Sequence, residues 1–383
     1  MTAPAAPTTT EAERAAALGA LGASPAVIEE LLAYGVPPVA DEAFGAFPPL
    51  PLPDEPCVAA WDRYVTAAAR EGAFATLQRR LVQLRFPIAA GMSETPAYLA
   101  ATRRGDAADA APGLALAAPE SVRLFVHPTA AGRVPVIVAG TRTDFVRLLQ
   151  ALTRRNEPAP IPESMGACIV GGYNNWDRVR ALRATWAADR PPAERTDAAW
   201  EATFRTLVPR RELYQDRFIL LSDGPYSATP GEAFGTAPDA WRRVSAVIRL
   251  EHECAHYFTK RVFGTMRNTL VDELAADYAG IVAAVGEFRS SWFLRFMGLE
   301  HARGYRAGGR LENYRGDPPL SDEAFAMLQT LVRRAAMQLE RFDAGARAAA
   351  APPETPRVIA GIARLGLELL AGDDGARRLA DVV

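Results

Sequence analysis

Residues 252–277, HECAHYFTKRVFGTMRNTLVDELAAD, decide how the centre of this chain is built. His252 and His256 are four residues apart, and in an α-helix such residues lie about 40° apart around the axis and about 6 Å apart along it. The spacing therefore lets both imidazoles reach one metal ion. Glu253 would lie beside that ion without binding it.

The residues before this pair support a helix. Thr236, with Asp239 three residues later, predicts its start, and Gly264 predicts its end. The inward face at 3.6-residue spacing consists of Trp241, Val244, Ile248, His252, Ala255 and Thr259. The imidazoles thus continue an apolar stripe.

A second helix follows, and Asn268 or Thr269 is suited to cap it. Glu273 and Asp277 project from its otherwise apolar face, where unpaired carboxylates are costly. A metal ion bound by one acid, with the other accepting a hydrogen bond from a ligating imidazole, accounts for both. We therefore predict Glu273 as the third ligand and Asp277 as the partner of a histidine. Zinc takes such ligands, and a catalytic zinc keeps a fourth position open for water, whose proton Glu253 can accept.

These residues resemble the gluzincin metallopeptidases, the thermolysin-like branch of the zincins, whose pattern is H-E-x-x-H on one helix and E-x-x-x-D on the next. The resemblance implies zinc bound by His252, His256 and Glu273. It also implies Glu253 as general base and Asp277 as the residue that orients a histidine.

The resemblance is limited to about residues 240 to 285. Upstream, Phe218 to Leu221 reads as a strand, and by resemblance it is the candidate for an edge strand that pairs with extended substrate. The alternative is an ordinary core strand.

A polar cluster downstream is where a donor to the developing oxyanion is expected. Its members are His301, Arg303, Tyr305, Arg310 and Tyr314. We name Tyr305 and His301 as the catalytic candidates, and a solvated arginine-rich connection is the alternative.

Composition limits the partners. A formal net charge of −2 over 383 residues indicates no nucleic-acid partner. No apolar run reaches the roughly 20 residues that span a bilayer, and the amino terminus lacks a signal-peptide pattern, so we expect a soluble cytoplasmic protein without membrane contact. Cys57, Cys168 and Cys254 are too widely spaced to predict a disulfide framework, and Cys254 reads as a buried apolar residue.

Four regions are expected along the chain. Residues 1–56 hold short helices and a proline-rich strap, residues 57–210 a mixed α/β region, residues 211–345 the zincin-like catalytic region, and residues 346–383 a linker and a last helix.

Several elements are predicted from local patterns. Residues 122–126, 136–138 and 167–170 read as strands, and Thr141 and Ser321 read as helix caps. After the third strand, Gly171 to Asn175 is either a backbone anion cradle or a plain strand-to-helix turn.

We therefore expect an α+β fold, with a zincin-like core, a mostly helical C-terminal half and a mixed N-terminal part. The expected function is zinc-dependent hydrolysis of peptides or proteins. Two alternatives remain: a non-catalytic zincin-like binding or scaffold protein, and a zinc hydrolase of a non-peptide amide. The sequence does not indicate an oligomeric state.

Overall fold

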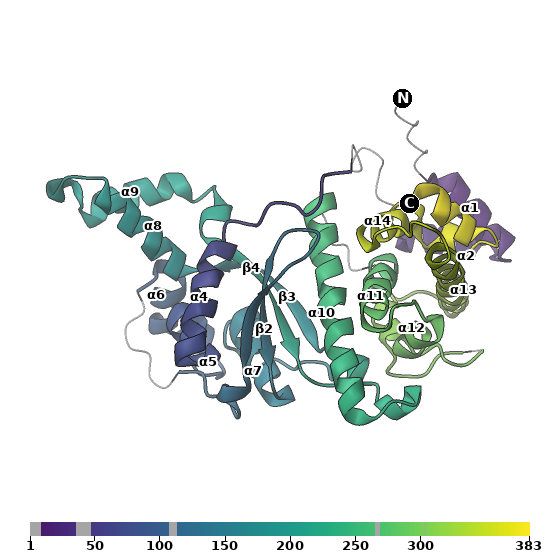
Figure 1. Ribbon diagram of the computed structural model, residues 1–383, viewed down its shortest axis with the longest axis horizontal. Coiled ribbons are helices and arrows are strands. Elements are labelled where there is room, and N and C mark those ends of the chain that lie inside the picture. Colours follow the sequence, from purple (N-terminus) through teal and green to yellow (C-terminus); the bar gives the residue numbers. More distant parts are fainter. Residues whose placement is uncertain (1–8, 36–46, 107–112, 265–268, 303) are drawn as a thin grey trace. The chain divides into compact units, whose positions relative to one another are not determined.

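The computed structural model describes residues 9–35, 47–106, 113–264, 269–302 and 304–383 (Figure 1). Helices predominate, and four strands form one mixed sheet. The predicted α+β class is therefore confirmed. Among the described residues, no helix combines the length and the apolar character that crossing a bilayer demands.

The chain divides into two compact units. The helical unit comprises Met1–Leu50 and Pro225–Val383, and the sheet unit comprises Pro51–Gly224. These boundaries differ from the four expected regions. The first two helices pack on C-terminal helices α13 (Asp322–Arg347) and α14 (Thr355–Leu370), so both ends of the chain share one unit.

The sheet unit holds all four strands, in the order β1-β2-β4-β3. Their bounds are β1 Arg123–His127, β2 Val134–Ala139, β3 Ala167–Asn174 and β4 Gln215–Ser222. β1 and β3 each pair antiparallel with a neighbour, whereas β2 and β4 are parallel.

The prediction that Phe218 to Leu221 forms an edge strand that pairs with substrate is wrong. Phe218 to Leu221 lies in β4, which has β2 on one side and β3 on the other. Both rows of its backbone groups are therefore used within the sheet, and no edge is left for a peptide. Phe218, Ile219 and Leu220 are fully buried, as in the core-strand alternative.

Helices α4 Val58–Glu71, α5 Ala73–Arg80 and α7 Arg142–Thr153 contact the strands of this sheet. Helix α6 Pro96–Arg104 contacts the 3₁₀ segments Val82–Arg85 and Met92–Glu94. Helices α8 Trp176–Ala188 and α9 Asp197–Leu207 share a separate aromatic cluster that includes Trp186 and Trp200. Gly72, with φ +85°, separates α4 from α5. Thr141 caps α7 as predicted, because its side chain accepts a hydrogen bond from the Asp144 N–H. Trp61, Phe145 and Phe218 belong to one shared core.

Gly171 to Asn175 forms neither the expected cradle nor a separate turn, because Gly171 to Asn174 continue β3 and the chain passes directly into α8 at Asn175. Asn175 caps α8 with its own side chain, which accepts from the N–H groups of Asp177 and Arg178. Its amide also donates to the buried carboxylate of Asp216 at 2.6 Å. The start of this helix is therefore satisfied by the chain itself.

The helical unit holds the remaining helices. They are α1 Glu11–Ala20, α2 Pro25–Tyr34, α10 Pro238–Phe263, α11 Leu270–Val285, α12 Ser290–Met297, α13, α14 and α15 Gly375–Val382. Ser321 caps α13 as predicted. The last predicted helix is interrupted at Gly366, where φ is +78°, and α15 follows it. The buried Arg14 and Glu368 join α1 to α14 through an ion pair of 2.7 Å.

Part of the expected proline-rich strap, residues 36–46, lies outside the described residues. Phe47 packs against Phe258 with ring centroids 6.3 Å apart, and the Arg357 guanidinium lies over the Phe47 ring. Phe47 thus anchors the described end of this segment in the helical unit.

Candidate metal centre

Helix α10 carries the two imidazoles. It begins at Pro238 with Ala237 as N-cap, not at Thr236, because a proline in the first turn has no N–H that would stay unpaired. It ends at Gly264 in the left-handed conformation, as predicted. His252 and His256 both lie on its buried face.

Helix α11 runs alongside α10 within the helical unit (Figure 1). Thr269 begins it with a capping box, in which Thr269 and Asp272 exchange side-chain to backbone hydrogen bonds. A Cβ atom at Gly280 would lie 2.5 Å from the Ile248 carbonyl oxygen of α10. Glycine at this position therefore allows the close approach of the two helices that carry the candidate ligands.

Three predicted ligands converge between these helices. The Nε2 atoms of His252 and His256 are 3.1 Å apart, Glu273 Oε2 is 3.7 Å from Nε2 of His252, and Glu273 Oε1 is 3.5 Å from Nε2 of His256. In a tetrahedral zinc site, bonds of about 2.0–2.2 Å place neighbouring ligand atoms about 3.3 Å apart. The donor set and its spacing therefore fit zinc.

Asp277 sits where it can orient His252. Its Oδ1 is 2.8 Å from Nδ1 of His252, and its carboxylate is fully buried. This contact assigns the ring proton to Nδ1 and leaves the Nε2 lone pair facing the other two donors. The hydroxyl of Tyr226 also lies 2.9 Å from Nδ1 and donates to Asp277. Tyr226 was not among the predicted site residues.

His256 lies in a more negative environment. Burial lowers its pKa, but the carboxylates of Glu273 and Glu253 outweigh burial, so the pKa of His256 is raised above its ordinary value. Its Nδ1 atom is buried and has no hydrogen-bond partner within the described part of the chain.

Glu253 is the predicted general base, and its carboxylate has no partner in the described segments. It is 9% exposed, and no hydrogen bond or ion pair to its carboxylate occurs there. A buried carboxylate is costly without a partner. Glu253 follows His252 directly in α10, and its charge contributes to the raised pKa of His256.

Arg310 adds a positive charge that the prediction had not assigned to this site. It comes from a short 3₁₀ helix, Arg310–Tyr314, and its Nη2 lies 2.6 Å from Glu273 Oε2 and 3.0 Å from Asp277 Oδ2. Its Nη1 donates to the Tyr226 hydroxyl at 3.0 Å. Arg310 therefore links the expected ligand, its supporting acid and Tyr226.

The charges explain the protonation states. Burial raises the pKa of Glu273 and of Asp277, but Arg310 and the imidazoles outweigh burial, so both pKa values lie below the ordinary range. Both acids are thus held as carboxylates. For Tyr314, burial and the neighbouring Glu273 carboxylate raise the pKa, which keeps its hydroxyl protonated.

This arrangement can bind a divalent cation chemically. Two neutral imidazole nitrogens and one carboxylate oxygen are the ligand set of a zinc site with one open position. Each ligand is fixed by its helix, and one is also fixed by a hydrogen-bonded acid.

A protein-family model described as a family of unknown function (DUF7005) matches residues 16–374. The chain belongs to the DUF7005 family. No curated protein and no solved structure matches it.

In this DUF7005 chain, the two residues predicted to stabilise an oxyanion have their contacts elsewhere. Tyr305 packs edge-on against Phe325, with ring centroids 5.3 Å apart. His301 is exposed, and its carbonyl accepts from Arg333. Neither makes a hydrogen bond to the candidate ligands among the described residues. The structure instead brings Arg310 and Tyr314 of the same predicted cluster to Glu273; Arg303 lies outside the described residues.

The three cysteines of the DUF7005 chain form no disulfide bond among the described residues. Burial raises the pKa of the Cys254 thiol well above its ordinary value, which agrees with its interpretation as a small apolar residue.

Proposed function

We propose that the chain is a zinc-dependent peptidase in which His252, His256 and Glu273 hold the metal ion. The observation that carries this proposal is the convergence of three ligand atoms at the spacing of a tetrahedral site, beside an unpartnered buried carboxylate. The likeness of the motif to gluzincins supports peptides or proteins as the substrate class.

When bound, zinc would supply a Lewis acid and would lower the pKa of its bound water to about 7. Glu253 accepts the proton of the attacking water and returns it to the leaving amine. Asp277 keeps the ring of His252 in the orientation and tautomer that present Nε2. Arg310 keeps Glu273 ionised, so the carboxylate remains available as a ligand.

The test uses the purified full chain and a diverse peptide mixture, read by mass spectrometry, together with analysis of bound metal. We expect about one zinc ion per chain and cleavage that stops with a chelator and returns with zinc. Glu253→Gln should retain zinc and lose about 10²- to 10⁴-fold in rate, because it cannot accept the proton. Asp239→Asn, at an exposed position of the same helix, is the matched control.

Full cleavage by Glu253→Gln would refute the assigned base, and a chain that binds no zinc would refute the site. One observation favours a second candidate, a non-catalytic protein. Arg310 pairs with both Glu273 and Asp277 and so balances their charges without a metal ion. Zinc-loaded protein that cleaves neither peptides nor small amides would support this candidate, and activity on small amides alone would favour a non-peptide amidase.

A further inference from the structure

The sheet unit has a free edge at β3. β3 pairs with β4 on one side, and no strand within the described residues pairs with its other side. The Ser222 N–H donates to the Gly166 carbonyl at 2.8 Å, so Cys168 and Val170, which precede the register shift between Gly171 and Tyr173, direct their backbone groups toward β4. Ala167, Ile169 and Gly171 consequently direct their N–H and C=O groups outward. An outward row of this kind is a template for one more strand.

A groove of about 580 Å³ lies along this strand. β3 supplies one wall, and the others come from α6 and from the end of α7. Leu99 and Met165 add apolar surface to the groove, and Thr102 and Asn174 add polar groups. The groove therefore offers backbone pairing together with side-chain contacts on both faces of an added strand.

The charge of the groove has one sign. Arg103, Arg154 and Arg155 line it, and no acidic residue does. All three side chains are exposed. The guanidinium groups of Arg103 and Arg154 have no hydrogen bond or ion pair within the described ranges, whereas the guanidinium of Arg155 donates to the Ser93 carbonyl at 3.1 Å. Two guanidinium groups thus remain available to a ligand.

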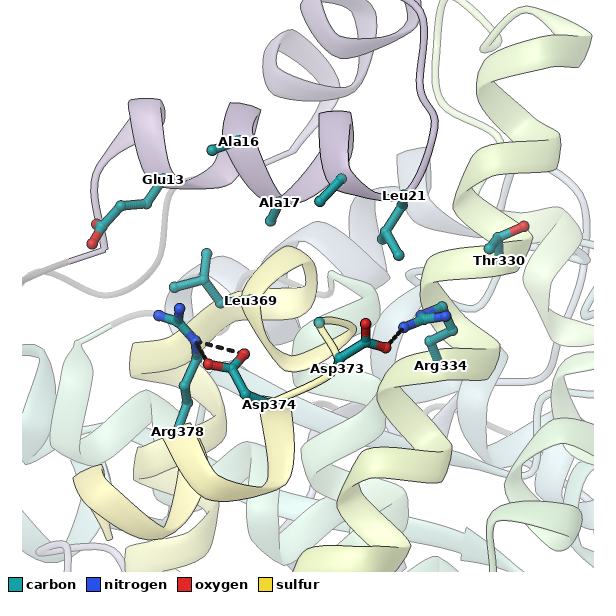
Figure 2. Close-up of a pocket in the computed structure, with 12 residues that line it drawn as sticks. Glu13, Ala16, Ala17, Leu21, Thr330, Arg334, Leu369, Asp373, Asp374 and Arg378 are labelled. Atoms are coloured by element: carbon teal, nitrogen blue, oxygen red, sulfur yellow. Dashed lines mark hydrogen bonds and ion pairs between the residues drawn. The ribbon is translucent and has the colours of Figure 1, made fainter.

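A second cavity, in the helical unit, shows the contrast (Figure 2). Arg334 donates there to Asp373, and Arg378 to Asp374 at 2.9 Å. Its arginines are neutralised by acids of the same cavity. No acidic residue that lines the β3 groove balances its arginines. The groove is therefore locally positive although the formal net charge of the whole chain is −2.

The arginines at the end of α7 are held by a defined turn. Arg155 and Asn156 both have positive φ, at 55° and 61°. The buried Asn156 amide donates to the carbonyls of Gln83 and Phe86, at 3.0 Å each. These bonds stabilise a backbone conformation that is uncommon for residues other than glycine. The guanidinium groups are therefore presented from a fixed base beside the strand edge.

We propose that this groove binds an extended acidic segment of a partner protein, which adds to β3 as a fifth strand. The outward N–H and C=O groups alternate as a peptide backbone requires, which a small anion or a nucleic acid would leave unused. The arginines select Asp and Glu side chains, and Arg can bind carboxylates in a bidentate manner. This inference is independent of the metal centre.

The probe is a fluorescein-labelled peptide, Glu-Thr-Glu-Val-Glu-Thr-Glu with blocked ends, titrated with the full chain and followed by anisotropy. We expect binding that weakens with salt, at least about tenfold weaker binding to Arg103→Glu/Arg154→Glu, and no binding of the lysine analogue. Arg104→Glu/Arg180→Glu makes the same charge change outside the groove and should change affinity by no more than about twofold.

Two further measurements separate strand addition from simple charge attraction. In an added strand, the N–H groups of every second peptide residue point toward β3 and those of the residues between them point away. N-methylation of the first set should abolish binding, and N-methylation of the second set should leave binding nearly unchanged. Exchange of the outward amides of Ile169 and Gly171 should slow with peptide. The proposal is overturned if the acidic peptide does not bind at about 1 mM, if both methylated peptides bind equally, or if inorganic phosphate displaces the peptide while those amides stay unprotected.

Discussion

Replacing Arg310 with leucine removes the positive charge that two buried carboxylates share. Arg310 is 11% exposed at its side chain and lies within 3.0 Å of both Glu273 and Asp277. Removing one partner of a buried ion pair costs about 3–5 kcal/mol, because the remaining charge is left uncompensated. We expect the free energy of unfolding of the chelator-treated Arg310→Leu protein to fall by this amount.

The helical unit should therefore melt at a lower temperature. For a compact unit of this size, Met1–Leu50 with Pro225–Val383, each kcal/mol shifts Tm by about 2–4 °C, which gives a decrease of about 6–20 °C. Bound zinc would compensate Glu273 in place of the guanidinium. The decrease should thus shrink by at least about half when zinc is added.

Differential scanning calorimetry with chelator and with excess zinc tests this reasoning. Arg242→Leu is the control, since Arg242 lies on α10 but pairs only at the exposed surface with Asp239. Its effect should stay within about 0.5 kcal/mol. A chelated Arg310→Leu protein that melts within about 2 °C of the wild type would show that Arg310 does not balance these carboxylates. An equal decrease with and without zinc would show that no ion takes over its role.

Three other outcomes are expected. Asp277→Asn should weaken zinc binding about 10- to 100-fold in a chelator-competition titration, because the histidine loses its charged acceptor. Gly280→Ala should destabilise the protein by about 1–3 kcal/mol in urea unfolding, since its Cβ meets a backbone oxygen; Gly345→Ala, with nothing within 4 Å, should stabilise it by about 0.5–1 kcal/mol. In metal-free protein, Glu273 has a pKa well below 4.5 in spite of burial, chiefly because of Arg310. The ionised Glu273 carboxylate should therefore stabilise the folded protein above about pH 4.5, and this stabilisation should disappear as the pH falls toward the pKa of Glu273 in the folded state. Urea midpoints that do not fall on acidification would contradict this.

Local patterns predicted the elements of the site well where a single helix determines the geometry. The four-residue spacing of His252 and His256 sets their mutual direction as soon as α10 forms. The same holds for Glu273 and Asp277 on α11. Caps such as Thr269 were also predictable, because a cap bonds to backbone groups only two or three residues away.

Residues from irregular segments were harder to assign. Tyr226 and Arg310 lie on short 3₁₀ helices, 84 positions apart in the sequence, and their hydroxyl and guanidinium meet at 3.0 Å. No periodicity marks such a pair. Within one polar cluster, the sequence favoured Tyr305 and His301, whereas the path of the chain brings Arg310 and Tyr314 to the carboxylates.

The sequence by itself determined the two helices with their facing side chains, the Thr269 cap, the end at Gly264 and the α+β class, because these depend on hydrogen bonds and side-chain spacing within a few residues. Only the tertiary structure decided that β4 is internal, that the two chain ends share one unit, and that a guanidinium joins the candidate ligands. These features depend on which distant segments bury surface against one another, and that choice is made by the packing of the whole unit.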